Sequence, residues 1–256
     1  MTTALDADAR LGAALDALVR QRPLLLGLDF DGTLAPLVER PADARALPGS
    51  LDAVTRLAAV PDVTVALVSG RARDDLIALT GLPDGGAVQL VGSHGAELGP
   101  HGPALDDAAR ERLSQVRQAL TAVAERHPGA HVETKPSAAV LHTRQLGPQQ
   151  SAAATAEALA WLSGQQGLHV TRGKEVVEVA VVPATKGAAL GVLRERLSAA
   201  ALLYVGDDVT DETVFATLGR SDVGVKVGAG ETVAAHRLAD PDAVRQLLRT
   251  LTSRLA

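Results

Sequence analysis

Two aspartates stand at the end of an apolar run near the start of the chain. Asp29 and Asp31 flank Phe30 in the segment LLLGLDFDGT. Because side chains alternate across a strand, both carboxylates point to the same side while Phe30 points into the packing. Gly32 permits a tight turn that exposes the pair. One Asp-Gly alone would indicate only a turn, but two carboxylates at a single strand end predict a ligand or cation site.

A second acidic group follows the apolar segment ALLYV. Asp207, Asp208 and Asp211 lie within five residues of one another and would repel strongly without a neutralising partner. Magnesium is the natural partner, because it takes hard oxygen ligands and keeps part of its shell for water and phosphate. Asp208 or Thr210 is also a candidate N-cap, and Asp211 with Glu212 suits the start of a helix. We therefore assign Asp207 to the metal and leave both Asp208 and Asp211 open between direct and indirect contact.

Two further segments suit an anion. Lys186 begins a helical stretch in ATKGAAL, where a cation opposes the helix dipole unless something negative lies nearby. Ser69 and Gly70 end the apolar run VTVALVSG, and the hydroxyl of Ser69 with the following backbone N–H groups can bind a phosphate oxygen. Each segment alone is weak, since exposed lysines tolerate helix starts and Ser-Gly is a common N-cap. Together with the two acidic groups they form a set suited to phosphoryl transfer.

The elements that must position these residues alternate between short apolar runs and Ala/Leu/Arg-rich stretches. This alternation is typical of a parallel sheet covered by helices, and runs that are apolar throughout indicate strands buried on both faces. The sequence therefore predicts an α/β, Rossmann-like core. We expect its strands near 23–30, 63–70, 87–93, 201–208 and 222–228, and its helices near 51–59, 72–79, 186–199 and 211–218.

The middle of the chain has a different pattern. A helical stretch over 104–126 precedes two close strands at 131–137 and 139–146, and a helix near 149–163 precedes two more strands at 167–172 and 175–181. This order indicates a small α+β module with an antiparallel sheet. We expect a core of residues 1–102 and 181–256, interrupted by an inserted α+β cap domain over 103–180.

Composition limits the other classes of function. The chain has 256 residues and no cysteine, which excludes disulfides and thiol catalysis. A net charge of -5 and 2% aromatic residues argue against nucleic acid as a partner. No apolar run reaches the length of a membrane helix, and the first residues lack the pattern of a signal peptide. We expect a soluble, cytoplasmic monomer that acts on a small molecule.

The four motifs, in this order, resemble those of the haloacid dehalogenase superfamily of phosphotransferases. The likeness spans both halves of the core, and the inserted module stands where that superfamily carries its larger type of cap. The resemblance implies that Asp29 is the nucleophile and that Asp31 protonates the leaving group and then activates water. Ser69, Gly70 and Lys186 would bind the phosphate, and Mg²⁺ would be held by Asp29, Asp31, Asp207 and Asp208.

Within that superfamily the chain is most similar to the trehalose-6-phosphate phosphatase family. The stretches that carry the likeness are DFDGTLAPLVERPADA, LVSGRARDDL, GSHGAEL, VETKPSAAVLHTR, GKEVVEV and GDDVTDETVF. From the inserted position of the cap we expect it to close by hinges near 99–103 and 181–184. The resemblance also implies that polar side chains face the sugar, namely Arg71, His94, Glu97, Lys135, His142, Arg144, Lys174 and Glu178.

Some alternatives remain open at this point. The charged residues of the module are equally typical of exposed strand edges. Thr143, Ala180 and Val181 depart from the family pattern, so a phosphatase of another glycosyl or pseudo-disaccharide phosphate is the main rival. A signalling receiver domain is about half this length and carries its acidic pair before the accepting aspartate. A catalytically silent regulatory protein would lack a motif residue, and no core motif residue is missing.

Overall fold

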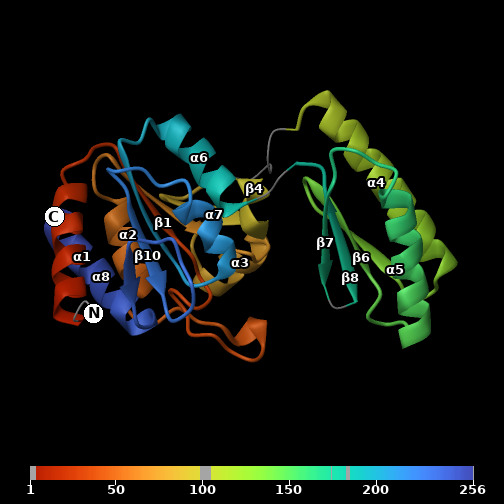
Figure 1. Cartoon of the computed structure of the whole chain (residues 1–256), viewed down its shortest axis with the longest axis horizontal. Coiled ribbons are helices and arrows are strands. Elements are labelled where there is room, and N and C mark those ends of the chain that lie inside the picture. Colours follow the sequence, from red (N-terminus) through yellow and green to blue (C-terminus); the bar gives the residue numbers. More distant parts are fainter. Residues whose placement is uncertain (1–3, 99–104, 174, 183–184, 256) are drawn as a thin grey trace. The chain divides into compact units, whose positions relative to one another are not determined.

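The structure, a computed structural model, describes residues 4–98, 105–173, 175–182 and 185–255. It divides into two compact units, one formed by Met1–Pro100 with Thr185–Ala256 and the other by His101–Ala184 (Figure 1). The hinge segments expected near 99–103 and 181–184 lie wholly or partly outside the described residues. Among the described residues, no helix combines the length and apolar character that a bilayer crossing requires.

The first unit is built on a largely parallel sheet. In its described residues seven strands run in the order β11-β10-β9-β1-β2-β3-β4, and only β4 is antiparallel to its neighbour. This confirms the predicted α/β core with a parallel sheet. The strands are β1 (Leu24–Leu28), β2 (Val63–Val68), β3 (Val88–Gly92), β4 (Glu97–Leu98), β9 (Ala201–Gly206), β10 (Val223–Val227) and β11 (His236–Leu238).

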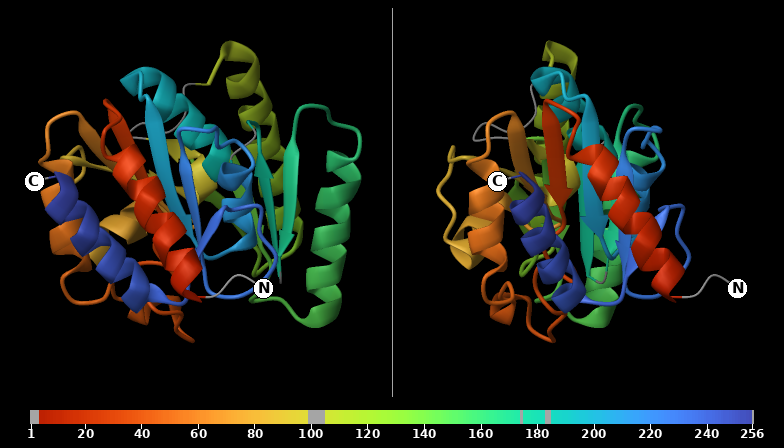
Figure 2. Two further views of the ribbon diagram at one scale, coloured as in Figure 1. Left: turned by 60° about the vertical axis from the view of Figure 1, so that its left-hand side comes forward. Right: turned by 90° about the vertical axis from the view of Figure 1, so that its left-hand side faces the viewer.

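Helices cover both faces of this sheet because its central strands are apolar at every position. Leu24, Leu26 and Leu28 of β1 share a core cluster with α1, α2 and α8, whereas Leu25 packs with α6 and α7 on the opposite face. Figure 2 shows α1 and α8 lying along the first of these faces. The helices are α1 (Ala4–Leu18), α2 (Ser50–Ala58), α3 (Arg73–Thr80), α6 (Lys186–Leu197), α7 (Glu212–Phe215) and α8 (Pro241–Leu255).

The second unit is a four-stranded antiparallel sheet, in its described residues, with two helices on one face. The strand order is β5-β6-β8-β7. Ala139 and Leu141 of β6 pack with Val177 and Val179 of β8 beneath the helices, so the residues between them lie on the other face. The elements are α4 (Asp107–Arg126), β5 (His131–Thr134), β6 (Ala138–His142), α5 (Pro148–Leu162), β7 (His169–Gly173) and β8 (Val176–Ala180).

The segment after β9 differs from the expected helix over 211–218. It begins as a 3₁₀ turn at Val209–Asp211, continues as the short α7, and then closes with i→i+3 hydrogen bonds, including Leu218 N to Phe215 O at 3.3 Å. The prediction of one continuous helix was wrong because the chain tightens at both ends of α7. The sequence analysis also did not predict β4, β11 or α8.

Candidate active site

The predicted motifs of the core meet at the carboxyl ends of neighbouring strands. Asp29, Ser69 and Asp207 directly follow β1, β2 and β9, which are adjacent in the sheet, and Lys186 begins α6. They line one pocket of about 470 Å³. All of its lining residues belong to the first unit: Asp29, Asp31, Leu37, Val38, Pro41, Ser69, Gly70, Arg71, His94, Lys186, Asp207, Asp208 and Thr210.

A buried ammonium group links two buried carboxylates at the floor of this pocket. Lys186 Nζ donates to Asp29 Oδ1 at 2.8 Å and to Asp211 Oδ1 at 2.7 Å. Lys186 is 2% exposed, Asp29 4% and Asp211 0%. Although burial works against its charge, Asp29 and Asp211 raise the pKa of Lys186. Two carboxylates thus supply the negative charge that a lysine at a helix start requires.

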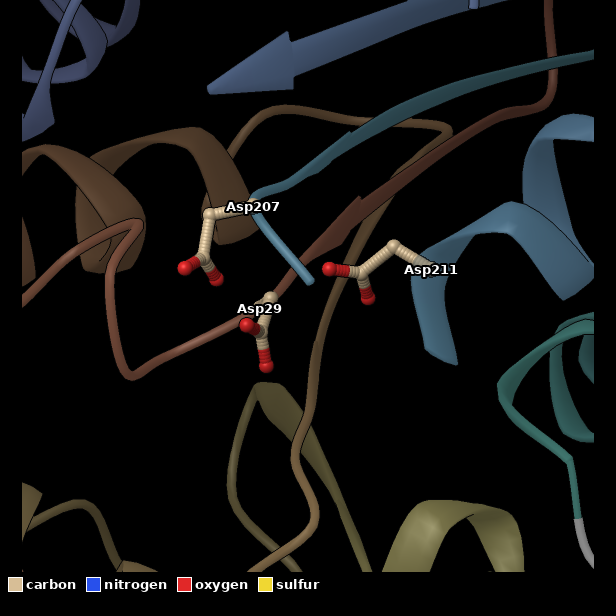
Figure 3. Close-up of side chains that lie close together, drawn as sticks. All are labelled: Asp29, Asp207 and Asp211. Atoms are coloured by element: carbon tan, nitrogen blue, oxygen red, sulfur yellow. The ribbon is translucent and has the colours of Figure 1, made fainter. Parts of the chain in front are cut away.

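Asp29, Asp207 and Asp211 bring three carboxylates together. One oxygen from each lies within 4.8 Å of the others, and Figure 3 shows the three side chains close together. Burial raises the pKa of Asp29 well above its ordinary value, with Lys186 opposing and Asp211 reinforcing the effect. Burial likewise raises the pKa of Asp207, while a hydrogen bond with Asp29 lowers it. The group is therefore short of positive charge despite Lys186.

The carboxylate of Asp207 meets the requirements of a cation ligand. Its Oδ1 is buried and has no hydrogen-bond partner among the described residues. Gly32 (φ 75°) makes room for it, because a Cβ on this residue would lie 2.0 Å from Asp207 Oδ2. An unpartnered carboxylate oxygen beside other carboxylates fits a hard divalent ion such as Mg²⁺.

Asp31 lies in the same pocket but is held by Arg71. The guanidinium donates from Nε to Asp31 Oδ2 and from Nη2 to Asp31 Oδ1, both at 2.6 Å. The hydrogen bond to Asp31 raises the pKa of Arg71, which therefore stays charged. Arg71 also lies over the ring of Phe30, 5.9 Å from its centroid. Arg71, which was predicted to bind the sugar, therefore contacts Asp31, the predicted acid.

Asp208 lies outside the three-carboxylate group, although it lines the pocket. Its Oδ2 accepts a hydrogen bond from Thr210 Oγ1 at 3.2 Å, and its backbone N–H donates to Asp211 Oδ2 at 2.8 Å. Burial opposes the change, yet hydrogen bonds from the Val209 backbone and from Thr210 lower the pKa of Asp208. This residue thus acts as a capping group for the turn, while Asp211, which the sequence left open, joins Asp29 and Asp207.

The segment after β2 that was predicted to bind phosphate packs against the loop that carries His94. Ser69 Oγ accepts a hydrogen bond from Arg71 N at 3.2 Å, and the Ser69 carbonyl accepts one from His94 N at 2.9 Å. The His94 ring fills the space that a Cβ on Gly70 would need. Ser69, Gly70 and His94 therefore share one wall of the pocket.

Glu97, which was expected to face the sugar, instead accepts hydrogen bonds from residues of the first unit. Its Oε1 accepts a hydrogen bond from Ser93 Oγ at 2.6 Å, and its Oε2 accepts one from Arg73 N at 2.7 Å. The residue is buried and is not among those lining the pocket. Ser93 and His94 both have positive φ, at 49° and 55°. Glu97 thus stabilises the unusual backbone that presents His94.

The second unit carries its predicted polar residues near one sheet face. Lys135 Nζ donates to Glu178 Oε1 at 3.1 Å. His142 bonds Glu133 Oε2 at 2.9 Å and stacks on its cross-strand partner His131, with ring centroids 4.6 Å apart. Arg144 is exposed in the turn after β6. Lys174 lies outside the described residues.

Two of the three departures from the family pattern occupy positions in the core of the unit, away from that polar face. Thr143 is fully buried; its hydroxyl lies 2.7 Å from Ser151 Oγ on α5 and donates to the Glu175 carbonyl at 3.1 Å. Val181 belongs to the apolar core of the unit. Ala180 is nearly buried and pairs with Ala138 and His169. Two of the three changes therefore belong to packing within the unit.

Three residues with clear contacts escaped the sequence analysis. Tyr204 OH donates to Asp211 Oδ1 at 2.6 Å. Lys226, 4% exposed, donates to the backbone carbonyl of Asp207. Glu133 contacts His142 as described above. Only Glu133 left a signal in the sequence, because it lies two residues before Lys135 and so shares its side of the strand.

Comparison with known proteins places this site in a family. A family model described as trehalose-phosphatase matches residues 27–251. A bifunctional trehalose-6-phosphate synthase/phosphatase of Thermoproteus tenax is 37% identical over 90% of this chain and 32% of its own length. The probable trehalose-phosphate phosphatase 9 of Oryza sativa subsp. japonica is 31% identical over 94% of this chain and 72% of its own length. The present chain thus spans about a third of the archaeal protein.

A solved structure agrees with these sequence matches. The trehalose-6-phosphate phosphatase of Aspergillus fumigatus is 26% identical, with a TM-score of 0.65 over 94% of this chain and 97% of that one. The matches cover both units and every motif that lines the pocket. The chain therefore belongs to the trehalose-phosphatase family, whose members are phosphoric monoester hydrolases.

Proposed function

We propose that the chain hydrolyses trehalose 6-phosphate to trehalose and phosphate in a magnesium-dependent reaction that passes through an aspartyl phosphate on Asp29. The observation that carries this proposal is the meeting of Asp29, Asp31, Lys186 and Asp207 in one pocket. Their types match the requirements of phosphoryl transfer, in which a nucleophile, a proton donor and positive charge must converge on one phosphate.

Asp29 and Asp207 would hold the metal, with Asp211 beside them and Asp208 within the same pocket. Bound magnesium supplies positive charge that neutralises the carboxylates and the phosphate oxygens. The unpartnered Asp207 Oδ1 supports this assignment. So does the burial that raises the pKa values of Asp29 and Asp207, because a bound cation would stabilise the ionised form of both groups. Asp31, included among the expected ligands, contacts Arg71 instead in this structure.

The side chains then divide the reaction between them. A carboxylate oxygen of Asp29 attacks phosphorus, the bond from phosphorus to the sugar oxygen breaks, and Asp31 gives its proton to that oxygen. Asp31, now ionised, takes a proton from a water molecule, whose oxygen attacks phosphorus, releases phosphate and restores Asp29. Lys186 holds Asp29 in place, and Ser69 with the backbone of Gly70 offers donors to the phosphate oxygens.

Selection of the sugar is proposed for the polar face of the second unit, with Arg71 and His94 of the first. Lys135, His142 and Glu178 supply directional hydrogen-bonding groups suited to a hydroxyl-rich disaccharide. The core position of Thr143 and Val181 supports trehalose 6-phosphate over the rival sugars, because these differences from the family pattern need not touch the ligand.

Phosphate release from a panel of sugar phosphates tests the proposal. The panel compares trehalose 6-phosphate with sucrose phosphate and with glucosyl- and mannosyl-glycerate phosphates, each with and without magnesium. We expect the highest kcat/KM with trehalose 6-phosphate and no turnover after chelation of the metal. Equal rates across the panel would contradict the substrate, and activity that survives chelation would contradict the metal.

A further inference from the structure

A single tyrosine lies beneath the candidate active site without lining it. Tyr204 is the only tyrosine of the chain, is fully buried on β9, and lies outside the pocket. Its hydroxyl donates to Asp211 Oδ1 at 2.6 Å. A buried phenol needs one hydrogen-bond partner, and here that partner is a carboxylate of the catalytic cluster.

The carboxylate that accepts from Tyr204 also holds the catalytic lysine. Asp211 Oδ1 accepts from both Tyr204 OH and Lys186 Nζ, and Lys186 Nζ reaches Asp29 Oδ1 at 2.8 Å. Asp211 Oδ2 accepts a hydrogen bond from the backbone N–H of Asp208. A continuous set of short contacts therefore connects the tyrosine hydroxyl to the proposed nucleophile. Among buried groups such connected bonds depend on one another.

Packing against neighbouring residues fixes the ring of Tyr204 in place. It lies opposite Gly27 of β1 in the register, and a Cβ on Gly27 would approach Tyr204 Cδ2 to 2.8 Å. Phe215 contacts the ring edge-on, with centroids 5.6 Å apart and planes at 64°. Gly27 stands inside an otherwise apolar strand, a position where glycine often allows close approach. Packing against Gly27 and Phe215 fixes the direction in which the hydroxyl points.

The hydroxyl remains a donor in these surroundings. Burial, reinforced by the charges of Asp211 and Asp29, raises the pKa of Tyr204 well above its ordinary value. A tyrosine that only filled the core would be replaceable by phenylalanine, which occupies the same space. Its hydroxyl would then be irrelevant to the reaction rate.

We propose that Tyr204 is a positioning residue for phosphoryl transfer, whose hydroxyl fixes Asp211 and thereby holds Lys186 against Asp29. The inference rests on the proposed role of Asp29 as nucleophile. Loss of the hydroxyl leaves Asp211 with one donor fewer in a buried site, so the lysine and the nucleophile lose their fixed geometry. Substrate contacts are not touched, because Tyr204 does not line the pocket.

The variant Tyr204→Phe removes one oxygen atom and tests this directly. With trehalose 6-phosphate and saturating magnesium we expect kcat to fall about tenfold and KM to stay within about twofold of the wild type. Leu202→Val is the matched control, since it shortens a buried side chain on the same strand that has no polar atom. It should lower the melting temperature and leave kcat unchanged. An unchanged kcat in Tyr204→Phe, or an equal loss in Leu202→Val, would overturn the proposal.

A second measurement uses the wild-type chain alone, so the test does not depend on the variant folding. Orthovanadate with magnesium serves as the probe of the occupied site. Because Tyr204 is the only tyrosine, we expect a tyrosine difference signal in the near-ultraviolet absorbance when vanadate binds. No tyrosine signal on saturation with vanadate would overturn the proposal. Activity surviving in Asp29→Asn would instead refute the proposed nucleophile, so the two failures are distinguishable.

Discussion

The ion pair between Asp31 and Arg71 constrains how the proposed acid can work. Both oxygens of Asp31 accept hydrogen bonds from the guanidinium of Arg71, so neither is directed at a leaving group in this structure. Arg71 must therefore turn to another hydrogen-bond acceptor before Asp31 can protonate the leaving oxygen as proposed. The phosphate or the sugar of the substrate can supply that acceptor, since Arg71 lines the pocket. Substrate binding and activation of the acid would then be one event.

Arg71→Lys tests this coupling at the level of one residue. A lysine keeps the charge but cannot bridge both oxygens of Asp31 or donate in a planar fork. We expect kcat/KM to fall about tenfold or more, with much of the loss in KM. Arg40→Lys is the control, because Arg40 forms an exposed pair with Asp43 and surface pairs contribute little. Equal kinetics for Arg71→Lys and the wild type would contradict a role for the guanidinium.

At the scale of elements, the sheet order assembles the site from distant parts of the chain. Strands β9, β1 and β2 are neighbours, so their carboxyl ends deliver Asp207, Asp29 and Ser69 to one edge. The loop between β3 and β4 adds His94, which requires left-handed backbone at two successive residues. Glu97 offsets the cost of this conformation by bonding Ser93 and the backbone of α3.

Glu97→Gln should weaken that loop. The amide has only one acceptor oxygen and no charge, so it cannot accept from Ser93 Oγ and Arg73 N at two separate oxygens, and both buried hydrogen bonds lose their charged acceptor. We expect the free energy of unfolding to fall by about 2 kcal/mol in urea denaturation. KM should also rise, because His94 loses its fixed position. Glu195→Gln, at an exposed site on α6, should change neither quantity. Matching stabilities for the two variants would contradict the role of Glu97.

Sequence patterns predicted the strand ends better than the contacts between them. Apolar runs that stop at Asp29, Ser69 and Asp207 follow from burial on both faces of a parallel sheet. β4 and β11 escaped prediction because they have two and three residues and depend on pairing with a neighbour. The contact between Asp31 and Arg71 spans 40 positions, and alternation indicates only the side on which each lies. In the sequence Tyr204 is indistinguishable from the other apolar residues of its strand. Its role depends on the contact between its hydroxyl and Asp211, which only the structure shows.

On the scale of the whole molecule, each unit has its own apolar core. The first unit contains the complete proposed machinery for phosphoryl transfer, and the second carries the other polar residues expected to face the sugar. Changes in the second unit should therefore alter KM and substrate preference more than the chemical step. Changes in the acidic group of the first unit should alter the response of the whole fold to metal and pH.

The dependence of folding stability on pH has a definite sign. Burial raises the pKa values of Asp29 and Asp207 in the folded chain, so without metal the fold binds more protons than the unfolded chain. Stability then falls as pH rises from about 4, the ordinary pKa of aspartate, through the raised values. Under the proposed assignment, magnesium would bind the ionised groups and restore that stability. The increase in melting temperature on adding magnesium should therefore grow as pH rises through this window.

Thermal melts with and without magnesium across this pH range measure the effect. Asp207→Asn is the matched variant, because the amide keeps the shape and removes the charge. We expect it to lose most of the magnesium-dependent increase. An increase that is the same at every pH, or that survives intact in Asp207→Asn, would contradict the proposed metal site.

The central claim is that Asp29 carries the phosphoryl group during turnover. Mass spectrometry of protein quenched in acid during reaction with trehalose 6-phosphate tests it most directly. We expect a peptide containing Asp29 that is heavier by one phosphoryl group in the wild type and absent from Asp29→Asn, which should also release no phosphate. A phosphoryl group on another residue, or full activity in Asp29→Asn, would contradict it.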